Sequence, residues 1–109
     1  MNAQVMICPA DESIRERFAE EIGGLVHATG PVSYDYHFPK RAIFDQLTML
    51  SWLRDGSLFA ADATHLALRD DQLLGIEIGF PGTEWKAREA ALGSLWTVLI
   101  DGGQVSQHD

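Results

Sequence analysis

Residues 64–80 read THLALRDDQLLGIEIGF, and this stretch decides the fold class of the chain. Apolar residues alternate with polar or small ones in the run 64–69, and again in the run 73–80 after the acidic pair 70–71. A period of two is typical of β-strands, and two such runs around a short polar turn predict a β-hairpin. Pro81-Gly82 ends the second strand.

A further strand is predicted at the start of the chain. The run Ala3–Cys8 is apolar, contains β-branched residues and is closed by a proline. Asp11 follows as a candidate N-cap of the first helix, and Ser13 with Glu16 forms an alternative capping box. The first helix is therefore expected to begin at one of these two places.

The first helix shows apolar residues at helical spacing. They are Ile14, Phe18, Ile22, Leu25 and Val26. Gly23-Gly24 weakens this helix by about 1 kcal/mol for each glycine relative to alanine, and marks a candidate bend or break. Gly30-Pro31 ends it.

The segment 31–39 is predicted to be a loop rich in aromatic residues. Pro39 suits the first turn of a second helix, which is expected to continue to about Arg54. The apolar stripe of that helix leaves Trp52 on its far side. An exposed tryptophan indicates contact with another element or another chain.

A third helix is predicted after the hairpin, with Thr83 as its cap and Asp101 near its end. Arg88 and Glu89 are expected on its solvent face. Its apolar face comprises Trp85, Leu92, Leu95, Trp96 and Leu99. The order of elements predicts an α+β fold, an antiparallel three-stranded sheet with about three helices.

Length and charge narrow the class of protein. The 109 residues suit a single domain, expected over residues 1–103 with a flexible tail over 104–109. A formal net charge of −8, without a basic cluster, disfavours nucleic acid as a partner. Apolar runs are too short to span a membrane, and no secretory signal is visible. We expect a cytoplasmic protein.

Few residues offer chemistry on their own. A lone cysteine, Cys8, provides neither an internal disulfide nor a multi-thiolate site, and no two histidines have the spacing of a helical zinc pair. No metal is therefore expected. His27 suits the end of the first helix, and His65 is expected to face solvent from its strand.

The aromatic loop is the segment most like a binding site. Tyr34, Asp35 and Tyr36 combine aromatic rings with a carboxylate, and such residues line small-molecule pockets. The alternative is that one or two of these rings fill the gap between helices. Both interpretations stay open at this point.

Taken in order, these segments resemble the N-terminal half of the GNAT acyltransferase superfamily. The opening strand with its Pro-Ala and Asp11, the segment 29–36 between helices, and the hairpin strands 66–69 and 73–82 carry the resemblance. It implies the acceptor-substrate side of an N-acetyltransferase, with Tyr34, Asp35 and Tyr36 as substrate-binding residues. The family holds acetyl-coenzyme A through a fourth strand and a pyrophosphate loop, and neither is expected in this chain.

We therefore expect an acetyltransferase-like part that is inactive alone, with no cofactor of its own, no assignable catalytic residue and a small-molecule amine as a possible acceptor. The alternative is a stand-alone homodimeric interaction module derived from that fold. A homodimer, or a missing C-terminal half, is expected to use Leu73–Phe80 and the helix Thr83–Ile100. A complete enzyme of an unrelated class that uses the aromatic loop is a third possibility.

Overall fold

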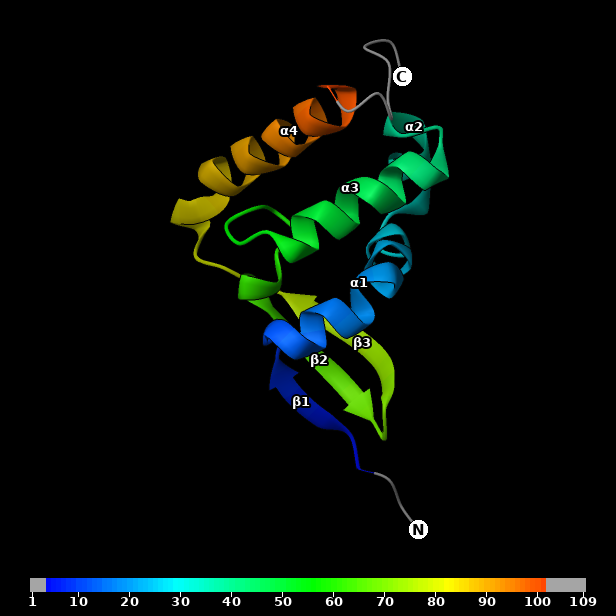
Figure 1. Cartoon of the computed structure of the whole chain (residues 1–109), viewed down its shortest axis with the longest axis vertical. Helices are drawn as coiled ribbons and strands as arrows, with labels where there is room; N and C mark the ends of the chain where they lie inside the picture. Colours follow the sequence, from blue (N-terminus) through cyan, green and yellow to red (C-terminus); the bar gives the residue numbers. More distant parts are fainter. Residues whose placement is uncertain (1–3, 102–109) are drawn as a thin grey trace.

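The computed structural model describes residues 4–101, and it confirms the α+β class (Figure 1). The elements follow in the order β1 Met6–Pro9, α1 Glu12–His27, α2 Pro31–His37, α3 Arg41–Leu53, η1 Ala61–Ala63, β2 Thr64–Arg69, β3 Gln72–Ile78, η2 Gly82–Glu84 and α4 Trp85–Asp101. The tail expected over residues 104–109 lies outside the described residues. None of the helices within residues 4–101 is long and apolar enough to cross a bilayer.

The sheet is antiparallel with strand order β1-β2-β3, as the hairpin pattern predicts. Leu66 of β2 lies opposite Cys8 on one side and Ile76 on the other. Ala67 lies opposite Gly75 and Leu68 opposite Leu73, so β3 carries one extra residue and the ladder is bulged there. One face of the sheet packs under α1, while none of the helices within residues 4–101 covers the opposite face (Figure 1).

Asp11 is the cap of α1. Its Oδ1 accepts a hydrogen bond from the backbone N–H of Ile14 at 3.0 Å and another from Ser13 Oγ at 3.0 Å. The bond from the Ile14 N–H lowers the pKa of Asp11 below its ordinary value. Ser13 therefore supports the Asp11 cap and does not serve as the alternative cap.

The double glycine does not break α1; it lets α3 approach closely. A Cβ atom on Gly23 would lie 2.6 Å from Asp45 Oδ1 and 2.8 Å from Thr48 Oγ1. Thr48 is fully buried, and Arg41 holds the Asp45 carboxylate through a 2.9 Å hydrogen bond. Gly24 faces outward, and the nearest atom to a Cβ there is 3.7 Å away.

Replacing Gly23 with alanine is expected to lower the free energy of unfolding by about 1–2 kcal/mol, because overpacking between helices outweighs the gain in helix propensity. Gly24→Ala is the matched control and is expected to raise it by about 0.5–1 kcal/mol. Urea denaturation of both variants measures the difference. Equal changes in the free energy of unfolding for the two substitutions would contradict the close approach of α3 to α1 at Gly23.

The segment predicted as an aromatic loop is partly helical, which corrects the prediction. Pro31 is the first residue of the short helix α2, where its fixed φ angle is favourable and its missing N–H costs nothing. This helix has seven residues and none of them is fully buried, so the sequence shows no apolar periodicity there. The next helix, α3, begins at Arg41, so Pro39 precedes the helix and does not lie within its first turn.

Trp52 is buried, contrary to the prediction that it lies on an exposed face. Its side chain has no exposed surface, and its Nε1 donates a 2.7 Å hydrogen bond to the carbonyl oxygen of Arg15 in α1. The reason is the place of α3 between α1 and α4 (Figure 1). A helix that packs on two sides has no single solvent face.

The face assigned to solvent on α4 is also partly wrong. Arg88 is only 8% exposed, while Trp85 on the predicted apolar face is 49% exposed. Leu95 and Leu99 do pack against Ile43 of α3, as the spacing predicted. Arg88 is buried between Glu84, four residues earlier, and Asp62 of η1, and the pairing with Asp62 is one that helical periodicity does not reveal.

Candidate functional site

A groove of about 400 Å³ opens between the end of α1, α2 and β3. The residues that line it are Leu25, Val26, Thr29, Tyr34, Phe59, Gly75, Ile76 and Ile78. Most of these side chains are apolar. The polar side-chain groups in the lining are the phenol of Tyr34 and the hydroxyl of Thr29. The groove thus combines an apolar surface with a small number of polar groups, which is typical of small-molecule sites.

Tyr34 is placed in this groove by the turn that begins α2. Its backbone N–H donates to the carbonyl oxygen of Gly30 at 2.9 Å. Its half-buried ring lies 4.9 Å from the ring of Phe44, which belongs to the main core, and 6.4 Å from the ring of His27. The ring of Tyr34 therefore both contacts the core and lines the groove.

Asp35 has a different environment. Its Oδ1 lies 2.8 Å from Nε2 of His27, the last residue of α1. This contact ties α2 to the end of α1, where a histidine was expected. The structure therefore places Asp35 in a bond between helices, and it is not among the residues that line the groove.

Tyr36 lies apart from the groove and is 80% exposed. Its ring contacts the imidazole of His37 edge to face, with centroids 5.1 Å apart. Successive residues of a helix are rotated by about 100°, so the side chains of Tyr34 and Tyr36 point about 160° apart. Of the three predicted binding residues, only Tyr34 lines the groove.

The other groove residues were not predicted from the sequence. Leu25, Val26 and Thr29 come from the end of α1, and Phe59 comes from the segment between α3 and η1. No local spacing joins these positions, because the groove forms only when α1 crosses the sheet. Ile76 and Ile78 did carry a signal, since their alternation places them on the helix-covered face of β3.

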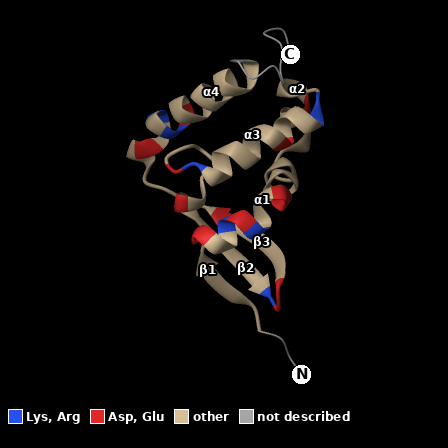
Figure 2. Cartoon of the chain, in the orientation of Figure 1, with Lys and Arg blue, Asp and Glu red and all other residues tan. Residues whose placement is uncertain are grey.

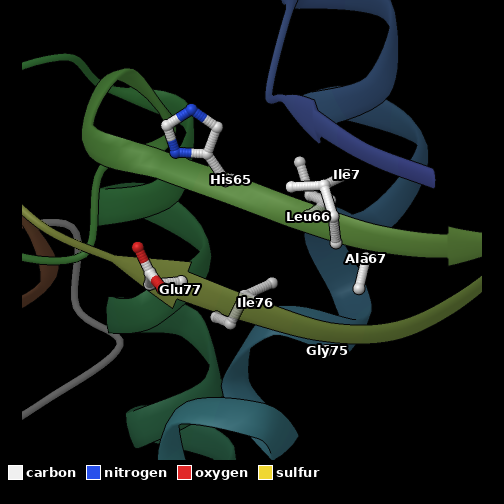
Figure 3. Close-up of a pocket in the computed structure, with 7 residues that line it drawn as sticks. All are labelled: Ile7, His65, Leu66, Ala67, Gly75, Ile76 and Glu77. Atoms are coloured by element: carbon white, nitrogen blue, oxygen red, sulfur yellow. The ribbon is translucent and has the colours of Figure 1, made fainter. Parts of the chain in front are cut away.

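A second hollow of about 470 Å³ lies on the sheet face opposite the helices (Figure 3). Ala67 and Gly75 lie opposite each other there, and His65 lies opposite Glu77 on the neighbouring strands. His65 is exposed, as predicted, and Ile7, which lies opposite Ala67, is 67% exposed. No group of three or more His, Cys, Asp or Glu residues within 4–101 is arranged to hold a metal ion.

Charged residues are spread over the elements, without a basic patch in the part of the chain that the structure shows (Figure 2). Carboxylates cluster beside the hairpin end of β3. Glu20, Glu21 and Asp45 line a hollow with Leu73 and Arg41, and Arg41 is paired with Asp45. This hollow is therefore lined by three carboxylates and one guanidinium.

Comparisons with other proteins give no family. No family model matches the chain, and no match is found among curated proteins or solved structures. The function is therefore inferred from the groove, the sheet and the resemblance described above.

Proposed function

We propose that the chain forms the acceptor-substrate side of a GNAT-like N-acetyltransferase and holds an amine acceptor in the groove beside Tyr34. The observation that carries the proposal is the place of this groove. It lies between β3 and the segment that joins α1 to α3, where the resemblance implies that the acceptor binds. An antiparallel sheet in the order β1-β2-β3, with α1 across one face, supports the same resemblance.

The groove favours an acceptor with an apolar body and a cationic amine. Leu25, Phe59, Ile76 and Ile78 offer apolar surface, which contributes about 25 cal/mol for each Å² removed from water. The phenol of Tyr34 provides a hydrogen-bonding group at the groove. The net charge of −8 attracts a cationic ligand over a distance of about one Debye length.

An amine probe tests this proposal. Amide NMR spectra of the isotope-labelled chain are expected to shift at Thr29, Tyr34, Ile76 and Ile78 when phenethylamine is added. Phenethyl alcohol, which has the same ring but no charge, is the control and is expected to bind more weakly. Shifts confined to the opposite sheet face, or no shifts at all, would rule out the groove as the acceptor site.

Acetyl-coenzyme A is expected not to bind this chain tightly. Within the described residues, β3 is followed by η2 and α4, where the resembled family has a fourth strand and a pyrophosphate loop. A pyrophosphate needs a cluster of backbone N–H groups at a helix start, and the net charge of −8 repels it. Calorimetry at neutral pH measures this, and a stoichiometric micromolar isotherm would contradict it.

A homodimeric interaction module is the second candidate, because in the part of the chain that the structure describes β3 is an edge strand and one sheet face carries no helix. The helix α4, which is expected to share the interface, offers less apolar surface than the sequence predicted, since Leu95 and Leu99 are buried against α3. Trp85 and Val98 remain exposed on it. Sedimentation at tens of micromolar tests this candidate, and a clean monomer would exclude it.

A further inference from the structure

β3 presents an open edge to solvent. Among the residues that the structure describes, its one neighbour in the sheet is β2. The N–H of Gly79 donates to the carbonyl oxygen of Ala63 at 2.9 Å, toward the β2 side. Backbone groups alternate in direction along a strand, so the amides of Ile78 and Ile76 point away from β2. These amides are available to a further strand.

The groove beside Tyr34 runs along this same edge. Ile76 and Ile78 of β3 line it together with Leu25 and Phe59. A strand added to β3 would point every second side chain toward the helix-covered face. Those side chains would enter the groove, so the edge offers both backbone bonds and side-chain pockets, the two elements of strand addition.

The charged residues near the edge of β3 favour a basic partner strand. Glu77 is exposed on the helix-free face of β3. At the hairpin end, Glu20, Glu21 and Asp45 share the hollow beside Leu73 with one basic side chain, Arg41. A cross-strand partner of opposite charge stabilises such a pair by roughly 0.2–1 kcal/mol, whereas a like charge destabilises it. A second copy of the chain would bring a net charge of −8 to this acidic edge.

We infer that the edge of β3 docks an extended segment of another polypeptide, with apolar residues on one face and Lys or Arg on the other. The apolar residues enter the groove beside Tyr34, and the basic residues face Glu77. This goes beyond the proposed function, because it concerns a macromolecular partner. A docked strand fills the groove, so strand docking and amine binding exclude each other.

The test uses the full chain and a blocked peptide of alternating Lys and Val, equal in length to β3. The peptide is expected to slow amide hydrogen exchange at Ile76 and Ile78 and to displace phenethylamine. A peptide of alternating Glu and Val is the matched control and is expected to bind more weakly. Glu77→Lys should weaken binding of the Lys peptide by roughly two- to five-fold and strengthen binding of the Glu peptide. Glu77→Gln is the second variant, for the case in which Glu77→Lys does not fold.

Several results would overturn this inference. One is equal binding of the two peptides, and another is binding of the Lys peptide without protection of Ile76 and Ile78. Protection that rises with chain concentration in the absence of peptide would assign the edge to a second copy. Phenethylamine binding without peptide binding would refute the docking site and leave the proposed function intact. Protection of Ile76 and Ile78 by the peptide, without phenethylamine binding, would refute the proposed function and leave the docking site intact.

Discussion

Replacing Trp52 with alanine is expected to lower the free energy of unfolding by about 3–5 kcal/mol, the range for truncating a buried aromatic residue. The side chain has no exposed surface and lies in the main core with Phe18, Phe44 and Leu66. Its loss also removes the hydrogen bond to the Arg15 carbonyl. Since small domains are stable by about 5–15 kcal/mol, the variant should lose much of its stability.

Trp85→Ala is the matched control for this prediction. Trp85 is 49% exposed at the start of α4, where its ring stacks on Phe80 with centroids 6.3 Å apart. Its truncation is expected to cost about 1 kcal/mol. Chemical denaturation of the two variants compares them directly. A larger loss for Trp85 than for Trp52 would mean that the sequence-based assignment of faces was right and the described packing is wrong.

Replacing Arg88 with methionine is expected to lower the free energy of unfolding by about 1–3 kcal/mol, because it leaves the carbonyl oxygen of the buried Ser57 and two partly exposed carboxylates without their donor. Arg88 Nη1 donates to the carbonyl oxygen of Ser57 at 3.0 Å, and the two Nη atoms reach both oxygens of Asp62 at 3.2 and 3.3 Å. Nε donates to Glu84 at 3.0 Å, and the guanidinium lies over the ring of Phe80. These contacts fasten α4 to the segment before β2.

The same substitution should change the dependence of stability on pH. Burial alone would raise the pKa of Asp62, but the hydrogen bonds from Arg88 and from the Gly56 N–H outweigh it, so the pKa lies below the ordinary value of 3.8. A carboxylate with a lowered pKa stabilises the fold above its unfolded-state pKa, and this contribution is lost as the pH falls through the folded-state pKa. Wild type should therefore lose more stability than Arg88→Met on acidification below about pH 4.

Thermal melts at neutral and acidic pH measure both effects of Arg88. Lys86→Met, at an exposed position on the same helix, is the control and is expected to change stability by less than about 0.5 kcal/mol. Parallel pH profiles for wild type and Arg88→Met would show that the ion pair with Asp62 contributes nothing to the fold.

Much of the fold could be predicted because its signals are local. The alternation on either side of Asp70-Asp71 predicted the hairpin, and the start of α1 is at Asp11, one of the two predicted places. The errors concern features without a local period. α2 is too short to show one, and α3 buries two faces, so Trp52 was assigned to the wrong environment.

The candidate site could be predicted only in part. Tyr34 was singled out by its aromatic character, and the structure places it in the groove. Asp35 and Tyr36 were grouped with it because a loop has no fixed direction, whereas the helix α2 turns each side chain to a different side. Phe59 and the end of α1 reach the groove only through tertiary packing, which no spacing in the sequence encodes.

The binding of phenethylamine to tyrosine variants tests the acceptor groove most directly. Tyr34→Ala is expected to raise the dissociation constant for phenethylamine by about tenfold, equivalent to about 1.4 kcal/mol. Tyr36→Ala is expected to leave that dissociation constant within about twofold of wild type. Circular dichroism establishes that both variants are folded before the titration. An unchanged dissociation constant in Tyr34→Ala, or an equal loss in Tyr36→Ala, would contradict the assignment of the groove as the acceptor site.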